Sequence, residues 1–284
     1  MSCLLCQSTN HKKREGKVRD NPSLEILECC ECGLVFLSHV EHINETFYEN
    51  SGMHEKFDFG KWRKQTYADD KRRYEFVKPF IENKSVLDFG SGNGGFLQNA
   101  KKTAKNIAGV ELEKAVIPFY KEQNLPLYCN IDEIETSFDV ITSFHVIEHI
   151  KNPHTILKQL KKHLNDKGKL IIEVPNANDA LLTLYKSKAF SHFTYWSCHL
   201  YLYTAHTLQL LAQQCGFEVK FIKHIQRYPL SNHLYWLSYA KPGGHEKWGE
   251  LLDSEALSQA YEAQLASLEA TDTIMACFTK TNEQ

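Results

Sequence analysis

The chain has 284 residues, of which 42% are hydrophobic and 24% are charged. That size can bury a full domain core with a small appendage, so we do not expect a disordered chain. The 33 Lys and Arg balance the 35 Asp and Glu, which disfavours nucleic acid as a partner. No apolar run approaches the roughly 18 residues of a membrane-spanning helix, and the N-terminus lacks the apolar core of a secretion signal. We therefore expect a cytoplasmic protein without membrane contact.

Residues 1–40 form a cysteine-bounded unit. Its two pairs, Cys3-x-x-Cys6 and Cys29-x-x-Cys32, are separated by 22 residues. In a reducing compartment, pairs at this spacing indicate one tetrahedral zinc site rather than disulfides. Four thiolates leave no open coordination position, so we predict a structural Zn²⁺ in a zinc-ribbon-like module. Cys30 is a spare cysteine, which leaves a Cys30-x-Cys32 pairing as an alternative register.

The rest of the chain divides into two parts. Residues 41–84 are aromatic and basic at partly helical spacing, which predicts a helical connector packed on the next domain. From residue 85, short β-rich runs alternate with helical segments, a pattern typical of a parallel, doubly wound α/β sheet. We predict strands at 85–89, 106–111, 138–143 and 169–174, and helices at 94–104, 112–123 and 145–164, with Asn152-Pro153 and Gly168 as helix boundary signals.

The domain predicted for residues 85–284 becomes irregular and aromatic after Pro175. We interpret residues 176–206 and 228–269 as a substrate lid, the second part containing an acidic helix from about 249. A helix at 204–215 and a strand from 216 lie between the two lid segments. A last strand at 273–279 is apolar on both faces, which predicts that it is buried in the sheet.

A glycine loop between the first predicted strand and helix is the strongest chemical signal. Gly90, Gly92 and Gly95 satisfy G-x-G-x-x-G, which is weak alone. Glycines allow a tight turn and a close approach of the backbone to a ligand. Asp88 precedes this loop, and Glu111 ends the second strand, where a carboxylate can accept hydrogen bonds from both ribose hydroxyls. We infer a nucleotide-containing cofactor; a glycine turn needed only for packing is the alternative.

Together with Gly94 the loop reads D-x-G-x-G-x-G, which resembles the first motif of class I S-adenosylmethionine (SAM)-dependent methyltransferases. The resemblance covers about residues 85–225 and implies a Rossmann-like domain that binds SAM, with Asp88 near its cationic amino-acid end. A dinucleotide cofactor stays the competing interpretation. The cofactor-binding residues implied are Asp88, Gly90, Gly92, Gly94, Glu111, Phe144 and His145.

The segment from Phe138 to Ile150 resembles the fourth-strand motif of small-molecule methyltransferases, including ubiquinone-biosynthesis O-methyltransferases. The resemblance places Phe144 and His145 where the ligand crevice opens. On a helix, His145 and His149 would share one face, and either could be the general base for an acceptor hydroxyl. The alternative is that His149 ties the helix to neighbouring backbone.

Ser197 to Thr204 resembles a late segment of the same family and supplies His199 as a third candidate base. The segment is also similar to sugar C-methyltransferases, which share an N-terminal cysteine module and place a catalytic histidine there. Their acidic residue just ahead of that histidine is replaced by Cys198. A buried hinge histidine is the alternative for His199.

The resemblance implies methyl transfer from SAM to a polar small molecule, and we predict a sugar or nucleotide-sugar. One alternative is an RNA base methyltransferase with a zinc module, for which a local basic stretch could bind phosphate. The other is a non-catalytic SAM-binding protein. The basic stretch comprises Lys61, Arg63, Lys64, Lys71, Arg72 and Arg73.

Overall fold

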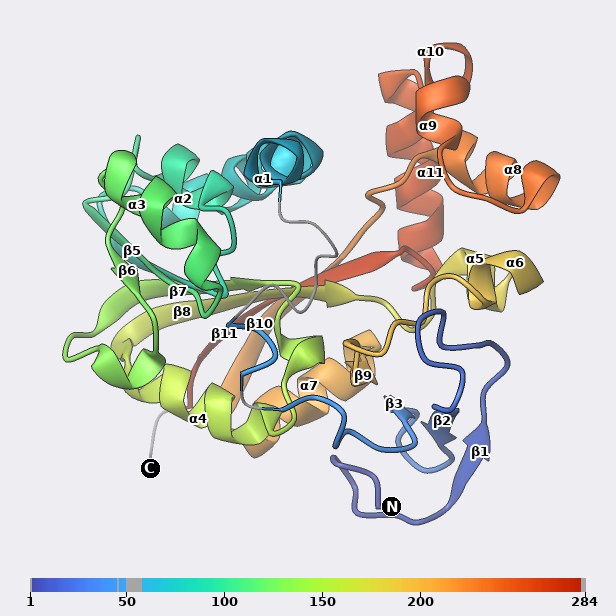
Figure 1. Ribbon diagram of the computed structural model, residues 1–284, viewed down its shortest axis with the longest axis horizontal. Helices are drawn as coiled ribbons and strands as arrows, with labels where there is room; N and C mark the ends of the chain where they lie inside the picture. The colour runs from blue at the N-terminus through green and yellow to red at the C-terminus, as the bar shows by residue number, and fades with distance from the viewer. Residues whose placement is uncertain (1, 45, 50–57, 282–284) are drawn as a thin grey trace.

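The computed structural model describes residues 2–44, 46–49 and 58–281. Its centre is a seven-stranded sheet with the order β10-β11-β8-β7-β4-β5-β6 (Figure 1). β4 to β8 run parallel, whereas β11 is antiparallel to β8 and β10 is antiparallel to β11. The Rossmann-like α/β sheet is thus confirmed, with an antiparallel pair at one edge. The strands are β4 (Ser85–Phe89), β5 (Asn106–Val110), β6 (Leu127–Tyr128), β7 (Phe138–Phe144), β8 (Leu164–Pro175), β10 (Phe217–Ile225) and β11 (Thr273–Lys280).

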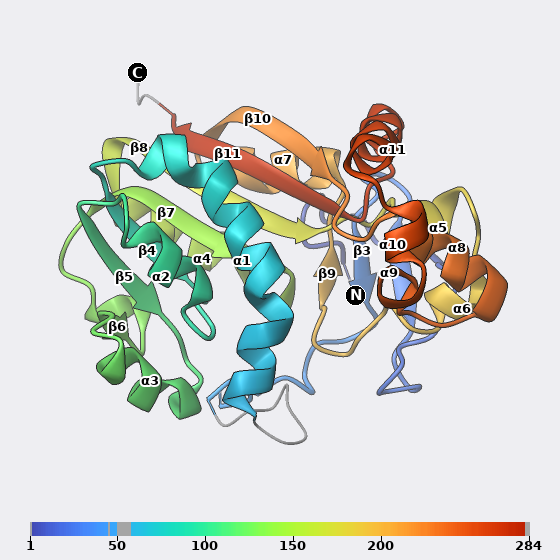
Figure 2. The same ribbon diagram turned by 90° about the horizontal axis from the view of Figure 1, so that it is seen from above.

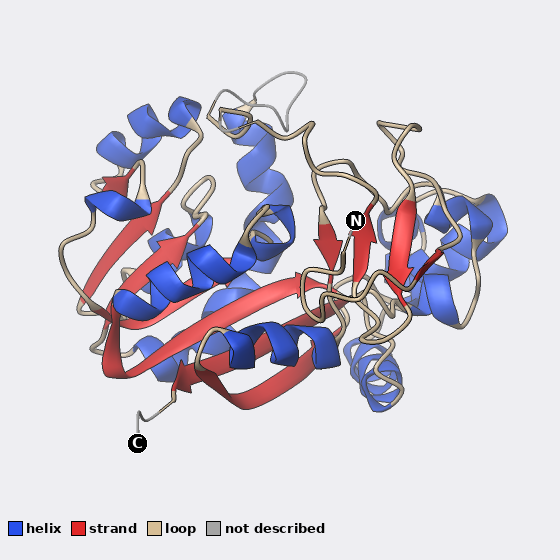
Figure 3. Ribbon diagram, turned by 90° about the horizontal axis from the view of Figure 1, so that it is seen from below, coloured by secondary structure: helices blue, strands red, loops and turns tan. Residues whose placement is uncertain are grey.

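Helices cover both faces of this sheet. α1 and α2 lie on one face, and α4 and α7 lie on the other (Figures 1 and 3). Neighbouring residues of a strand point to opposite faces, so Val86 packs with the first pair of helices and Leu87 with the core on the opposite face. The bounds are α1 (Phe59–Ile81), α2 (Gly95–Ala100), α3 (Ile117–Glu122), α4 (Pro153–Lys162) and α7 (Ala205–Gln214), with short 3₁₀ turns η1 (Lys114–Val116), η2 (Ile131–Glu133) and η3 (Ile147–His149).

β11 is the buried strand predicted near the C-terminus. Its residues from Thr273 to Phe278 are all buried. Ile274 and Phe278 belong to the core on the α4 and α7 side, and Met275 and Cys277 belong to the core below α1. The prediction from its two apolar faces is confirmed.

The cysteine-bounded unit forms a second, four-stranded sheet with the order β1-β2-β3-β9. β3 pairs with β9, which lies near the end of the first predicted lid segment, 176–206. Phe36 of β3 also belongs to the same core cluster as Leu208 of α7. This N-terminal sheet is therefore packed against the large sheet through a shared apolar core. Its strands are β1 (His11–Lys13), β2 (Ile26–Cys29), β3 (Val35–Leu37) and β9 (Tyr201–Leu202).

The remaining helices gather at one end of the molecule (Figure 2). The acidic helix predicted from 249 is two helices, broken at Asp253 and Ser254, where Ser254 begins a new helix by accepting a hydrogen bond from the backbone N–H of Leu257. No helix among the described residues is long and apolar enough to span a membrane. These helices are α5 (Ala180–Thr183), α6 (Lys188–Ser191), α8 (Leu230–Tyr239), α9 (Gly244–Lys247), α10 (Gly249–Leu252) and α11 (Glu255–Ser267).

Two other predicted helices differ from the structure. The helix expected at 145–164 is only the short turn η3 followed by α4. His145 has a left-handed backbone with φ of 56°, and Pro153 has no N–H to donate and a ring that favours a helix start. In the predicted connector, α1 begins at Phe59, and Phe57 lies outside the described residues.

Candidate active site

A cavity of about 590 Å³ opens beside the carboxyl ends of the central strands. It is lined by Asp88 at the end of β4, Glu111 after β5 and Phe144 at the end of β7. α1 forms another wall through Trp62 and Arg73. Ligands of doubly wound folds bind in this crevice, and the volume suits a cofactor-sized molecule.

The glycine loop turns through left-handed backbone conformations that favour glycine. The φ angles of Gly90, Gly92 and Gly94 are 73°, 52° and 72°. A Cβ on Gly90 would clash with the side chain of Val146. Gly90 and Gly92 line the cavity. Gly94 is not among the described lining residues and is the N-cap residue of α2.

Glu111 lies where the ribose-binding carboxylate was predicted, on the cavity wall after β5. It accepts hydrogen bonds from the backbone N–H of Gly92 at 2.7 Å and of Glu113 at 2.9 Å. Burial raises its pKa. Glu111 therefore holds the glycine loop to the end of β5 in addition to facing the cavity.

Asp88 is a buried carboxylate directly below the glycine loop. Its Oδ1 accepts a hydrogen bond from the Thr142 hydroxyl at 2.7 Å. Burial raises the pKa of Asp88 to about 7, against the opposing effect of the positive charge of Arg73. A cationic ligand group placed beside Asp88 would favour its ionised form.

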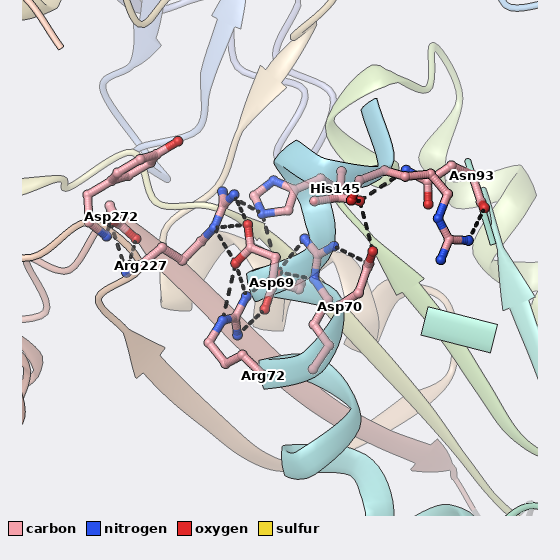
Figure 4. A network of polar contacts seen from close by, with 12 residues as sticks. Asp69, Asp70, Arg72, Asn93, His145, Arg227 and Asp272 are labelled. Atoms are coloured by element: carbon pink, nitrogen blue, oxygen red, sulfur yellow. Dashed lines mark hydrogen bonds and ion pairs between the residues drawn. The ribbon is translucent and has the colours of Figure 1, made fainter. Parts of the chain in front are cut away.

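An ion-pair network joins α1 to the sheet beside the cavity (Figure 4). Arg72 and Arg73 each contact the buried carboxylate of Glu173 on β8 at 2.8 Å. Arg227, after β10, donates to Asp69 of α1. Burial alone would raise the pKa of Glu173, but the arginine charges hold it well below its usual value.

This network removes Arg72 and Arg73 from the basic face considered for RNA. Arg72 and Arg73 point toward Glu173 instead of offering free charges to phosphate. The sequence does carry a signal for this, because Glu173 stands inside the apolar run of β8 and a buried charge needs a partner. The partners come from a helix about 100 residues earlier in the chain, so the pairing itself was missed.

His145 lines the cavity directly after β7. Its Nδ1 lies 3.2 Å from Glu148 Oε1, and its Nε2 lies 3.3 Å from Glu173 Oε1. Arg227 Nη1 is also 3.2 Å from that Nε2 (Figure 4). Both ring nitrogens of His145 therefore already have polar partners within the protein.

His149 and His199 form an edge-to-face pair at the other side of Glu148. His149 lines the cavity, and burial lowers its pKa. The ring of His199 meets that of His149 edge-on at 4.8 Å. His199 is not among the described cavity-lining residues, and burial lowers its pKa to about 3. One donor atom from each of Glu148, His149 and His199 lies within 4.8 Å of the others, a spacing that would also suit a metal ion.

The expectation that His145 and His149 share a helical face is wrong. The left-handed turn at His145 and the short η3 replace the expected continuous helix. Glu148 contacts both histidines from between them, at 3.2 Å and 3.9 Å. The predicted lid segments 176–206 and 228–269 contribute none of the described lining residues, although the neighbouring Arg227 does.

The four predicted zinc ligands come together at one end of the N-terminal sheet. The Sγ atoms of Cys3 and Cys32 are 3.5 Å apart, and those of Cys6 and Cys29 are 3.4 Å apart. All four Sγ atoms lie within 4.8 Å of one another. A tetrahedron with Zn–S bonds of about 2.3 Å has edges of about 3.8 Å, so this donor set fits a zinc ion. Cys30 is exposed and outside the cluster.

Comparison with known proteins assigns the family. A family model described as a methyltransferase domain matches residues 59–220, from the start of α1 into β10. The chain belongs to this methyltransferase family. The ubiquinone biosynthesis O-methyltransferase of Hydrogenovibrio crunogenus is 24% identical over 231 residues, covering 72% of this chain and 92% of the relative. The Coxiella burnetii protein of the same name is 26% identical over 166 residues, covering 54% of this chain and 71% of the relative.

Solved structures agree on the fold. A SAM-dependent methyltransferase from Archaeoglobus fulgidus superposes with a TM-score of 0.53 at 16% identity, covering 78% of this chain and all of that one. A putative methyltransferase solved in complex with the Trm112 activator of Haloferax volcanii gives 0.54 at 12% identity, covering 81% and 100%. Membership of the methyltransferase family makes this protein a SAM-dependent methyltransferase, and the dinucleotide interpretation of the glycine loop is set aside. The sugar acceptor stays a prediction that these relatives do not support.

Replacing Gly90 by Ala tests the glycine loop. Gly243 provides a matched control, because its φ is also positive, at 105°, but nothing lies within 4 Å of an added Cβ. We expect Gly90→Ala to lower the free energy of unfolding by at least about 1 kcal/mol more than Gly243→Ala, and to weaken SAM binding. Urea unfolding and calorimetry measure the two effects. Equal losses in both variants would contradict the clash with Val146.

Proposed function

We propose that this methyltransferase methylates a hydroxyl group on a small molecule with a ring-shaped, largely apolar body. The observation that carries this proposal is the composition of the cavity beyond the glycine loop. Aromatic and aliphatic side chains line this part of the cavity, together with the polar groups of His149 and Arg227. The relatives named ubiquinone biosynthesis O-methyltransferases favour the same acceptor chemistry. The apolar lining residues concerned are Tyr48, Phe144, Ile150 and Ile156.

The other half of the cavity is proposed to bind SAM. Asp88 would face the ammonium of its amino-acid end, and Glu111 would accept hydrogen bonds from the ribose hydroxyls. Because Gly90 and Gly92 have no Cβ, the backbone of the loop can approach SAM closely. Arg73 lines this region and acts on Asp88 through its charge, so it is our candidate partner for the methionine carboxylate.

In the proposed reaction, the protein aligns the acceptor and removes one proton. When bound, SAM supplies a methyl group on a sulfonium, which is already an activated donor. His149 is neutral at pH 7, because its pKa is lowered, and it can take the hydroxyl proton as the oxygen bonds to the methyl carbon and the carbon–sulfur bond breaks. Alignment supplies the larger share of the acceleration. We prefer His149 as the base. Both ring nitrogens of His145 already have polar partners, and His199 is not among the described cavity-lining residues.

Isotope-labelled SAM tests this function directly. The protein is incubated with a panel of phenols and catechols and, separately, with nucleotide-sugars, and products are identified by mass spectrometry. We expect label on a phenolic oxygen. Label only on nucleotide-sugars would restore the acceptor predicted from the sequence, and label on RNA would restore the RNA alternative.

We also propose that Cys3, Cys6, Cys29 and Cys32 hold a structural zinc ion. Closed thiolate sites contribute binding free energy to folding. Metal analysis of the purified protein should give one zinc per chain, and Cys29→Ser should lose it together with thermal stability. Cys30→Ser is the matched control and should keep both. A protein without zinc, or equal loss in the two variants, would contradict this ligand set.

The raised pKa of Asp88 predicts that SAM binding depends on pH. At pH values below about 7, the buried carboxyl is largely protonated, so binding an ammonium there must release a proton. SAM affinity should therefore rise between about pH 5 and 7, by at most about tenfold per unit. Calorimetry in buffers of different ionisation enthalpy measures the proton release. Asp88→Asn should bind SAM more weakly and lose this dependence; a wild-type affinity that is flat over the same range would count against Asp88.

The histidine assignment is tested by His149→Gln and His199→Gln. Loss of a general base typically costs about 10²- to 10⁴-fold in kcat, so we expect that loss for His149→Gln with unchanged SAM affinity. His199→Gln should retain more turnover, because His199 lies behind the cavity wall. A larger loss in His199→Gln would reverse the assignment. Turnover that requires an added divalent cation would instead assign Glu148 and these histidines to a metal.

A further inference from the structure

We propose that Asp20 and His42, outside the large sheet, are positioning residues for the acceptor half of the active site. They act by fixing Ser197, whose turn holds the edge-to-face pair of His199 and His149 beside the cavity. This inference rests on the proposed function, because that proposal defines which half of the cavity holds the acceptor. It gives the N-terminal part of the chain a role in acceptor turnover.

Each polar group of Ser197 is hydrogen-bonded to a side chain from the N-terminal part of the chain. Its backbone N–H donates to Asp20 Oδ1 at 2.9 Å, and its hydroxyl donates to Asp20 Oδ2 at 2.6 Å. His42 Nε2 contacts the backbone oxygen of Ser197 at 2.8 Å. Ser197 itself is buried. Three hydrogen bonds on one residue leave the local chain little freedom to shift.

The turn that contains Ser197 carries His199 to the histidine pair. The His199 N–H donates to the Trp196 carbonyl at 2.9 Å, which closes the turn. The guanidinium of Arg19 lies 4.8 Å from the Trp196 ring on one side. The His199 ring packs against Trp196 at 5.7 Å and against His149 at 4.8 Å. The turn is thus held between the N-terminal part of the chain and the cavity wall.

A second connection runs through Leu200. The backbone N–H of Leu37, in β3, donates to the Leu200 carbonyl at 3.1 Å. The Leu200 N–H in turn donates to the Glu148 carbonyl at 2.8 Å. One residue therefore joins the N-terminal sheet to Glu148, the neighbour of His149. A displacement of the N-terminal sheet would reach this side of the cavity first.

The SAM half has separate supports. The glycine loop is tied to β5, because Gly90 and Ser91 both donate backbone hydrogen bonds to the Val110 carbonyl, at 2.8 and 3.0 Å. Glu111 adds its bond to Gly92. Loss of the bonds at Ser197 should consequently affect acceptor turnover and leave SAM affinity nearly unchanged. A purely structural role would lower stability and affect both substrates together.

The Ser197 contacts can be removed without removing the core. Asp20 is exposed, and the buried side chains of Leu34 and Phe36 remain in place to hold the N-terminal sheet. Asp20→Ala should therefore fold, while the turn at residues 196–199 loses two of its anchors. A misplacement of about 1 Å in an active site can cost about 10²-fold in rate, so a measurable loss is expected.

The test compares Asp20→Ala and His42→Ala with Glu25→Ala, a control in the same part of the chain whose side chain pairs with Lys13 on the surface. Hydrogen exchange is followed by mass spectrometry for peptides covering 196–202, 145–150 and 86–95. Acceptor kcat and KM, SAM affinity and melting temperature are measured on the same proteins. Asp20→Asn, which keeps one acceptor oxygen, is the conservative variant.

We expect faster exchange at 196–202 and 145–150 in Asp20→Ala, with 86–95 unchanged. Acceptor kcat/KM should fall about tenfold or more, SAM affinity should stay within about twofold, and Asp20→Asn should restore part of the loss. Unchanged exchange at 196–202, or faster exchange with normal kcat/KM, would overturn the proposal, as would a parallel loss in Glu25→Ala. Failure of the wild-type protein to methylate any acceptor would contradict the proposed function instead. In that case hydrogen exchange at 196–202 alone decides the anchoring: faster exchange in Asp20→Ala would support it, and unchanged exchange would overturn it.

Discussion

A single buried carboxylate fixes the relation between α1 and the sheet. Glu173 lies inside β8 with its side chain removed from water, and an unpaired charge there would be strongly unfavourable. Arg72 and Arg73 supply the compensating charges from one turn of α1. The helix can therefore lie over the sheet in only a narrow range of positions. The cavity between them owes its shape to this constraint, since α1 forms one wall and the strand ends form the other.

The same carboxylate also organises the polar residues around the cavity. Glu173 Oε1 faces His145 Nε2 at 3.3 Å, and the backbone of His145 donates to the Glu173 carbonyl at 2.8 Å. His145 in turn contacts Glu148, which stands beside His149. Arg73 lies over the ring of Phe144 at 5.0 Å. Charge pairing that secures α1 thus also sets the orientation of side chains on both halves of the site.

A contact in this protein could be predicted from the sequence when its residues are close together along the chain. Asp88, Gly90, Gly92 and Glu111 line the cavity where the sequence placed them, because their geometry follows from a strand, a turn and the end of the next strand. Their binding of SAM stays a prediction. β11 was recognised because both of its faces are apolar. The pairing of Glu173 with α1 joins residues about 100 positions apart, and the pairing of β3 with β9 joins segments farther apart still. Spacing along the chain carries no signal for either contact. The continuous helix at His145 was an error of local geometry, because a left-handed residue and Pro153 interrupt the helical pattern.

The two proposed halves of the site differ in how far apart in the sequence their contacts lie. The proposed SAM half is built from neighbouring strand ends, so the fold alone nearly determines it, and relatives that share the fold can share it at low identity. The acceptor half depends on distant partners: Tyr48 before α1, Arg227 after β10, and the N-terminal sheet behind His199. Side chains in those segments can change without disturbing the glycine loop. Acceptor preference can accordingly diverge within this family while cofactor binding is retained, which is why relatives that identify the cofactor leave the acceptor to be determined on this chain.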